Sequence, residues 1–158
     1  MRGAHYAQEH AGVKDLLTKA VTCGGAFPHR LGASETVLVF DHHITFMGGF
    51  EAFLEALPAL RGRCVEKKLF VEAGPDEARR LAEAGVDGIQ LDKMPVDDLA
   101  AIVPELRAID PHLTLIAAGG INLQNAAAYA ATGVDGLATT APFTAKPIDM
   151  SVRMKRAE

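Results

Sequence analysis

Tryptophan is missing from this 158-residue chain, aromatic residues make up only 6% of it, and it has just two cysteines. The scarcity of aromatic residues, in a chain that is 49% apolar, disfavours a β-sandwich and favours an α/β protein rich in alanine, leucine and valine. Cys23 and Cys64 stand alone and show no metal-ligand spacing. They therefore predict reduced thiols in a cytoplasmic protein.

Long hydrophobic runs and an excess of basic residues are also absent. No apolar run is long enough to cross a membrane, and the first ten residues lack the apolar core of a signal peptide. The net charge of −4 disfavours a nucleic-acid-binding surface, so a small molecule is the expected partner. The length fits one domain over residues 1–158, in which we expect an irregular segment at 1–12.

Two kinds of apolar pattern alternate along the chain. Short apolar runs predict strands near residues 36–40, 69–71, 89–91, 113–117 and 137–140. Helical spacing or helix start signals predict helices near residues 13–21, 49–60, 75–84, 95–109 and 123–131, and a final strand or helix over 148–156. Alternating strands and helices imply a parallel sheet, barrel-like or doubly wound, with fewer strands than the eight of a closed barrel.

One short motif occurs twice. The sequence Gly-Val-Asp-Gly follows an expected helix and precedes an expected strand at residues 85–88 and again at 133–136. The first glycine of each copy is expected to end its helix, because glycine readily adopts the left-handed backbone conformation found there. A repeated helix–GVDG–strand unit is typical of stacked βα units.

The segment 113–125, LTLIAAGGINLQN, carries the clearest functional signal. An apolar strand leads into the turn Ala118–Gly120, where glycine lets the backbone bend tightly and approach a ligand. Asn122 is expected to cap the helix over 123–131. Free N–H groups and the positive end of a helix dipole favour phosphate, although a glycine pair can also simply make a tight turn.

Polar residues follow the expected strands at their carboxyl ends, where parallel α/β proteins bind ligands. These positions are Glu72, Asp92, the Ala118–Gly120 turn, Thr139 and Thr140, with Asp41, His42 and His43 after the first strand. Two carboxylates and a phosphate turn on one rim suggest a phosphate ester bound through Mg²⁺. The alternative is that Glu72 and Asp92 only cap the helices that follow them.

Two pairs of adjacent residues give further candidates. His29 and Arg30 lie in a glycine-rich loop and could grip an acidic small molecule, since a guanidinium binds carboxylates in a bidentate manner. The same pair could equally be ordinary surface residues. His42 and His43 are expected to point to opposite faces of a strand, which disfavours a shared metal ion.

Taken together, ordered motifs over residues 24–153 resemble the barrel domain of quinolinate phosphoribosyltransferases, also called carboxylating nicotinate-nucleotide pyrophosphorylases. The matching segments are Gly24–Gly32 (GGAFPHRLG), Thr36–Ile44 (TVLVFDHHI), Lys67–Glu72 (KKLFVE), Gly85–Lys93 (GVDGIQLDK), Ala117–Asn122 (AAGGIN), Ala130–Ala141 and Ile148–Val152 (IDMSV). The motif IQLDK at residues 89–93 and the phenylalanine at position 40 favour the ModD branch, whose members are found with molybdate transport systems.

The resemblance implies a fold, a reaction and a site. The fold would be an open or incomplete TIM-like barrel of parallel βα repeats. The reaction would transfer phosphoribosyl from phosphoribosyl pyrophosphate to a ring nitrogen of quinolinate, with loss of CO₂ and with Mg²⁺ as the cofactor. By position in the motifs, substrate carboxylates would meet His29 and Arg30, the ribose and metal would meet Glu72 and Asp92, and phosphate would meet Ala118, Gly119, Gly120 and Thr140.

Several positions depart from the family pattern. A Thr-Arg-Lys segment of the family falls near Tyr6–Gln8, its lysine after the first strand is Phe40, and its phosphate-binding glycine in the last strand turn is Thr140. Phe40 suggests a smaller or less acidic acceptor, and we expect the N-terminal domain of the family to be absent. The sequence leaves open an enzyme, an impaired phosphate- or nucleotide-binding module, and a fragment that needs a partner. Unpaired sheet edges predict a homo-oligomer.

Overall fold

The computed structural model describes residues 14–32, 35–146 and 149–156. Its elements are α2 (Lys14–Cys23), β1 (Val37–Val39), α3 (Asp41–Phe46), α4 (Phe50–Arg63), β2 (Leu69–Ala73), α5 (Pro75–Glu83), β3 (Gly88–Asp92), α6 (Val96–Ile109), β4 (Thr114–Ala118), α7 (Ala126–Ala130), β5 (Gly136–Ala138) and the 3₁₀ helix η1 (Ala141–Thr144). The segment 1–12, predicted to be irregular, lies outside the described residues.

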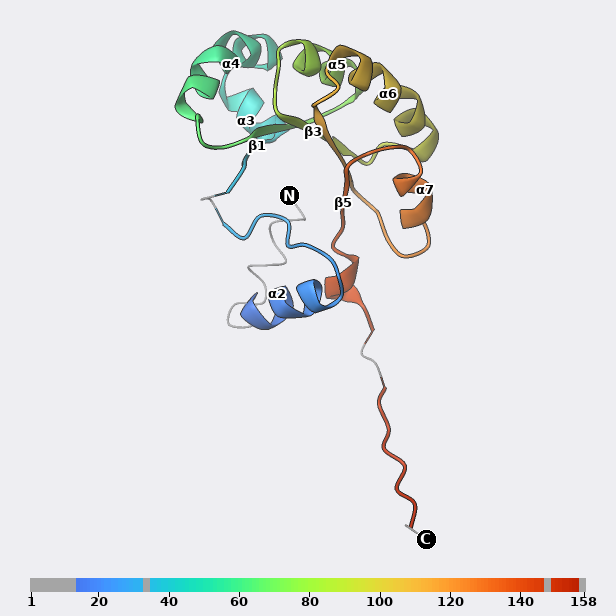
Figure 1. Cartoon of the computed structure of the whole chain (residues 1–158). Helices are drawn as coiled ribbons and strands as arrows, with labels where there is room; N and C mark the ends of the chain where they lie inside the picture. Colours follow the sequence, from blue (N-terminus) through green and yellow to red (C-terminus); the bar gives the residue numbers. More distant parts are fainter. Residues whose placement is uncertain (1–13, 33–34, 147–148, 157–158) are drawn as a thin grey trace.

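The five strands form one parallel sheet in the order β1-β2-β3-β4-β5, and the sheet does not close on itself. Figure 1 shows α4, α5 and α6 packed along one side of it. The predicted class, an α/β fold with an incomplete TIM-like barrel, is confirmed. None of the helices in the described part of the chain is long and apolar enough to cross a membrane.

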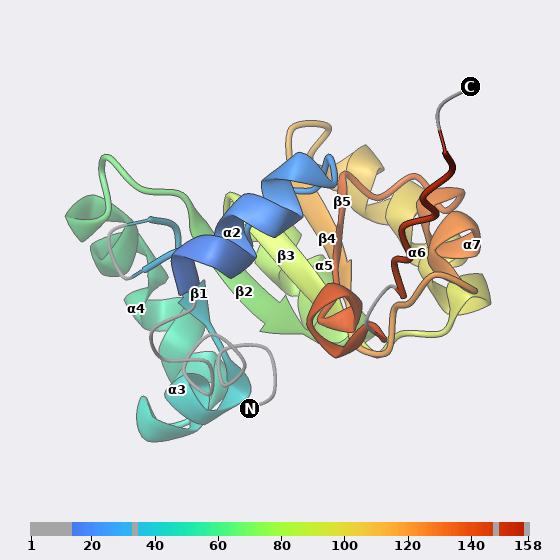
Figure 2. The ribbon, with the colours of Figure 1, turned by 90° about the horizontal axis from the view of Figure 1, so that it is seen from below.

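Successive side chains of each strand point to opposite faces of the sheet. The face toward the helices supplies the centre of the core, with Leu69, Val71, Ile89, Leu91, Leu115 and Ala117 buried among helix side chains. The second face carries Leu38, Phe70, Gln90 and Ile116. Helix α2 lies on this second side, away from α4 to α6 (Figures 1 and 2), and none of its residues is buried. The second face is therefore only partly covered.

The two GVDG motifs fold alike. The first glycine of each copy has a left-handed φ, of +77° and +89°. The aspartate then binds the start of the preceding strand: Asp87 Oδ2 accepts a hydrogen bond from the N–H of Leu69 (2.8 Å), and Asp135 Oδ2 accepts one from the N–H of Leu115 (2.7 Å). The motif thus aligns each new strand with its neighbour.

The helix predicted over 123–131 begins only at Ala126. Asn122 Oδ1 accepts a hydrogen bond from the N–H of Gln124 (3.0 Å), and Asn125 Oδ1 accepts one from the N–H of Asn122 (2.7 Å). These side-chain bonds hold a turn, and such bonds compete with helix formation. The prediction that Asn122 directly precedes and caps a helix starting at 123 was wrong.

Three other sequence expectations need correction. His42 and His43 lie in the first turn of α3 and not on a strand, and the centroids of their rings are 4.0 Å apart. The strand predicted over 137–140 ends at Ala138. Residues 149–156 form neither the predicted strand nor a helix, while Ile148 lies outside the described residues.

Candidate functional site

The register of the central strands brings the two predicted carboxylates to one rim. Glu72 on β2 pairs with Gln90 on β3, and Gln90 Nε2 donates a hydrogen bond to Glu72 Oε2 (2.8 Å). Asp92, two residues further along β3, points to the same face and pairs with Ala118 at the end of β4. The carboxyl groups and the glycine turn therefore lie at neighbouring strand ends.

The charges of the two carboxylates influence each other. Partial burial raises the pKa of Glu72, the charge of Asp92 raises it further, and the hydrogen bond from Gln90 opposes the shift. Like charges so placed repel each other, and a bound cation relieves that repulsion.

The diglycine turn passes directly over Asp92. A Cβ added to Gly119 would come within 2.7 Å of both Asp92 Oδ1 and the backbone nitrogen of Lys93, so no side chain fits there. The carbonyl of Gly120 accepts hydrogen bonds from the side chains of Asn122 (3.2 Å) and Asn125 (3.1 Å), which brace the turn. No acceptor within the described residues takes the N–H of Gly119 or Gly120.

Thr140 lies in the turn after β5, next to the same segment. The neighbouring Thr139 Oγ1 donates to the carbonyl of Ile121 (2.5 Å) and accepts from the N–H of Ala141 (3.1 Å). This hydroxyl ties the last turn to the residue that follows the diglycine pair. Thr140 is half-buried there and opens η1 as its N-cap residue.

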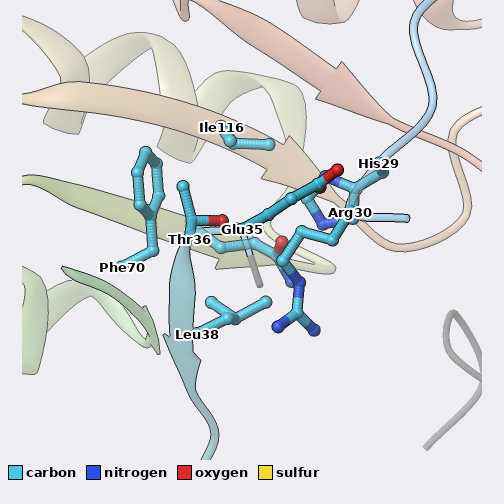
Figure 3. A pocket seen from close by; sticks show the side chains of 8 residues that line it. His29, Arg30, Glu35, Thr36, Leu38, Phe70 and Ile116 are labelled. Atoms are coloured by element: carbon cyan, nitrogen blue, oxygen red, sulfur yellow. The ribbon is translucent and has the colours of Figure 1, made fainter. Parts of the chain in front are cut away.

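His29 and Arg30 lie on the second face of the sheet, in the loop between α2 and β1. They line a cavity of about 210 Å³ with Glu35, Thr36, Leu38, Phe70, Gln90 and Ile116 (Figure 3). The loop is held by Leu31, whose carbonyl accepts from Lys14 Nζ (2.5 Å) and whose N–H donates to Glu35 (2.9 Å). Both residues line this cavity, but His29 is exposed and Arg30 is half-buried, so a ligand-binding role for the pair stays a prediction beside the surface alternative.

Two basic residues near the site have strained backbones. Arg30 and Lys93 have φ values of +52° and +53°, and they are the non-glycine residues of the described ranges in the left-handed region. Such strain costs on the order of 1 kcal/mol or more per residue, and it often accompanies functional sites. Lys93 also extends its Nζ to 3.1 Å from Asp92 Oδ2.

The idea that Glu72 and Asp92 cap the next helices is wrong. Neither α5 nor α6 has a side-chain cap hydrogen bond, and Glu72 bonds to Gln90. Within the described ranges, no group of three or more His, Cys, Asp or Glu residues could hold a metal. Two carboxylates nevertheless suit Mg²⁺, which proteins often hold with one or two carboxylates while phosphate and water complete its shell.

Sequence reasoning assigned no role to Gln90 or Lys93. Gln90 is only 6% exposed and is the buried polar residue of the described part of the chain. The sequence could have singled out Gln90, because this glutamine interrupts the apolar run Ile89–Leu91. A buried amide of this kind is costly without partners, so it marks a place where polar contacts matter.

The open parallel sheet, with carboxylates and a glycine turn on its carboxyl rim, defines an α/β protein of the incomplete-barrel type. The family described as "Quinolinate phosphoribosyl transferase, C-terminal domain" matches residues 8–153. The chain therefore belongs to the quinolinate phosphoribosyltransferase family.

Individual relatives agree with this assignment. The chain is 35% identical over 147 residues to a protein of Escherichia coli O127:H6 named as a pyrophosphorylase, ModD, covering 92% of this chain and 52% of that protein. It is 37% identical over 132 residues to the carboxylating nicotinate-nucleotide pyrophosphorylase of Mycobacterium leprae, covering 82% and 45% of the two chains.

A solved structure extends the likeness to three dimensions. The nicotinate-nucleotide pyrophosphorylase of Francisella tularensis superposes with a TM-score of 0.65 and 30% identity, over 75% of this chain and 40% of that one. The chain spans about half the length of the curated relatives it matches.

Proposed function

We propose that this chain carries a phosphoribosyl-transfer site, which takes phosphoribosyl from phosphoribosyl pyrophosphate and places it on a ring nitrogen of a small acidic or aromatic acceptor. The observation that carries the proposal is the convergence of Glu72, Asp92 and Gly119 on one rim. The Asp92 carboxylate lies directly against the diglycine turn, and its charge raises the pKa of Glu72.

Each part of the rim has a chemical task in this proposal. The N–H groups of Gly119 and Gly120, together with Thr140, would receive a phosphate, since unpaired N–H groups favour anions. Glu72 and Asp92 would hold Mg²⁺ together with the phosphates of the co-substrate. Mg²⁺ would supply neutralisation of the pyrophosphate charge as that group departs.

The protein itself contributes position and charge. Glu72 and Asp92 would stabilise the positive character that develops on the ribose as its bond to pyrophosphate breaks. His29 and Arg30 would hold the acceptor on the second face of the sheet, so that its ring nitrogen can approach the ribose. The proposal needs no nucleophilic side chain.

Release of pyrophosphate tests this proposal. The chain is incubated with phosphoribosyl pyrophosphate, Mg²⁺ and quinolinate, with nicotinate as a second acceptor, and pyrophosphate is measured against Asp92→Asn. Release that depends on an acceptor and on Asp92 is expected. Equal traces from both proteins, or none from either, would contradict turnover in this chain.

A phosphate- or nucleotide-binding module without turnover is the second candidate. It is favoured by the sparse positive charge of the cavity, where the lining residues include the cation Arg30 and the anion Glu35. This module would bind phosphoribosyl pyrophosphate and release no pyrophosphate.

Location and assembly complete the proposal. We place the chain in the cytoplasm, where Cys23 and Cys64, both free thiols, stay reduced. The outer edges of β1 and β5 have no neighbouring strand within the described chain, so a homo-oligomer is expected. A monomer by light scattering would contradict that expectation.

A further inference from the structure

Lys93 brings a positive charge to the rim, and the proposed function gives this residue no task. Its Nζ lies 3.1 Å from Asp92 Oδ2, on a carboxylate that would hold Mg²⁺ in the proposed function. The same positive charge opposes the rise in the pKa of Glu72, so it acts on both carboxylates of the rim. Lys93 and a metal ion would therefore compete for Asp92.

The backbone fixes the base of the Lys93 side chain. Its φ of +53° is left-handed, a conformation that is costly for a residue with a Cβ and is most often taken by glycine or asparagine. The N–H of Lys93 donates to the carbonyl of Ala118 (2.7 Å), the last residue of β4. A lysine held in this conformation, next to the proposed site, points to a use for its side chain.

The aliphatic part of the side chain lies against the diglycine turn. A Cβ added to Gly119 would come within 2.5 Å of Lys93 Cγ, so the two residues are in direct contact. Gly119 and Gly120 are also the residues whose N–H groups have no acceptor within the described part of the chain. Lys93 thus touches both halves of the proposed site, the turn for phosphate and the carboxylate for Mg²⁺.

The charged end of the side chain is only weakly held. The Lys93 side chain is 80% exposed, whereas that of Asp92 is 29% exposed. An exposed ion pair contributes little, because water screens the charges and the long side chain loses rotamer freedom. Mg²⁺ carries twice the charge of an ammonium group and prefers carboxylate oxygens, so it would displace Lys93 from Asp92.

We propose that Lys93 alternates between two anions: it neutralises Asp92 in the absence of Mg²⁺, and it binds a phosphate of phosphoribosyl pyrophosphate at the diglycine turn once Mg²⁺ has taken its place. The inference rests on the proposed function and makes Lys93 a phosphate-binding residue of that site. Because the lysine hinders the cation and helps the phosphate, its loss should have opposite effects on the two ligands.

Lys93→Met tests the inference, since it removes the charge and keeps an unbranched stem against Gly119. Free Mn²⁺, which prefers the same oxygen ligands as Mg²⁺, is counted by EPR in titrations without phosphoribosyl pyrophosphate. We expect the variant to bind Mn²⁺ about threefold more tightly than the wild type, because the competing ammonium group is gone. Calorimetry at saturating Mg²⁺ should show about tenfold weaker binding of phosphoribosyl pyrophosphate, because a charge-assisted contact with phosphate is lost.

Two further variants separate this role from general effects of charge. Lys68→Met removes an exposed lysine just before β2, at the opposite end of that strand from Glu72. It should change either affinity by less than about 1.5-fold, because salt screens distant charges. Lys93→Arg keeps the charge and should bind phosphoribosyl pyrophosphate within about threefold of the wild type. Circular dichroism checks folding, and Lys93→Asn, which tolerates a left-handed backbone, replaces Lys93→Met if that variant does not fold.

Several results would overturn the inference. They are unchanged or weaker Mn²⁺ binding by Lys93→Met, unchanged affinity of that variant for phosphoribosyl pyrophosphate, and equal shifts in Lys68→Met. A variant that is merely damaged would bind both ligands more weakly, which is not the expected pattern. A wild type that binds neither ligand contradicts the proposed function itself, whereas wild-type binding that does not depend on Lys93 contradicts the inference alone.

Discussion

The two ends of the same parallel sheet use aspartate and glutamate in opposite ways. At the amino end, Asp87 accepts the N–H of Leu69 and lies 3.7 Å from Arg61, while Asp135 accepts the N–H of Leu115 and pairs with Arg107 at 2.6 Å. Each of these carboxylates thus binds both a backbone N–H and an arginine of the protein.

The carboxyl end looks different. Among the described residues, Glu72 has one polar partner, Gln90, and Asp92 has one, the exposed Lys93. The adjoining glycine turn leaves two N–H groups without a described acceptor. Acidic residues whose bonds are satisfied within the protein stabilise the fold, and those with unused acceptor capacity remain available for a ligand. Substitutions at the two ends should therefore have separable effects on stability and on binding.

The largest effect is expected at Asp92. Asp92→Asn should weaken Mg²⁺-dependent binding of phosphoribosyl pyrophosphate on the order of 100-fold, because a charge aimed at the bound cation is lost. The free energy of unfolding should change by less than about 0.5 kcal/mol. Calorimetry and chemical denaturation measure the two quantities. Equal affinity of Asp92→Asn and the wild type would remove Asp92 from the site.

Alanine in place of Gly119 should affect both stability and binding. The added Cβ would meet the Lys93 backbone nitrogen and Asp92 Oδ1 at 2.7 Å, in a residue whose φ is +85°. We expect a destabilisation of about 2–3 kcal/mol, with loss of phosphate binding.

Gly133→Ala is the matched control at the amino end. Its φ is +89°, but its nearest neighbour would be Val103 at 3.6 Å, so only the backbone cost of about 1 kcal/mol is expected. Equal destabilisation by the two alanine variants would show that the turn does not press on Asp92.

Asp135→Ala should destabilise without affecting binding. Removing the carboxylate leaves the N–H of Leu115 and the guanidinium of Arg107 without their partner, at a cost of about 2 kcal/mol. Although burial raises the pKa of Asp135, the bonds from Leu115 and Arg107 lower it overall. The stabilisation is thus present above the ordinary value of 3.8 and is lost as the pH falls through the lowered pKa.

Asp98→Ala controls for the general loss of an acidic side chain. Asp98 is exposed in the first turn of α6, so its removal should cost no more than about 0.5 kcal/mol. The predicted contrast is contradicted if both variants lose the same stability, or if Asp135→Ala weakens ligand binding at temperatures where it is folded.

Glu72→Gln should have the smallest effect and the opposite sign. The pKa of Glu72 is raised by burial and by Asp92, so the wild type loses stability as the pH rises from 4.5 through that raised pKa. The variant should therefore be more stable than the wild type at pH 7, by less than about 1 kcal/mol after solvent screening. The gain should vanish below pH 4.5, and an unchanged gain in acid would contradict its electrostatic origin.

Much of the fold was predictable because its signals are local. Short apolar runs located all five strands, and the repeated GVDG motif indicated the βα units that the structure contains. The turn at Asn122 was missed, since side-chain bonds of Asn122 and Asn125 override the helical pattern there. The exact ends of β5 and the tail at 149–156 were missed, because their patterns are too short to distinguish strand from coil.

The candidate site was predictable only in part. Glu72, Asp92 and the glycine turn follow from the rule that parallel strands end at one rim. The contribution of Gln90 depends on register, because only pairing with Glu72 fixes its amide. The left-handed backbone of Arg30 and the cavity beside it depend on how a loop folds over the sheet, which a linear pattern does not encode.

Titration of the wild-type chain with phosphoribosyl pyrophosphate, with Mg²⁺ and then with excess chelator, tests the central claim most directly. The claim is that Glu72, Asp92 and the diglycine turn form one anion and cation site. It predicts saturable heat with Mg²⁺, at least a tenfold weaker affinity without it, and unchanged binding in Asp98→Ala. Absence of heat would contradict the claim. So would an affinity that is the same with and without Mg²⁺ and the same in Asp92→Asn as in the wild type.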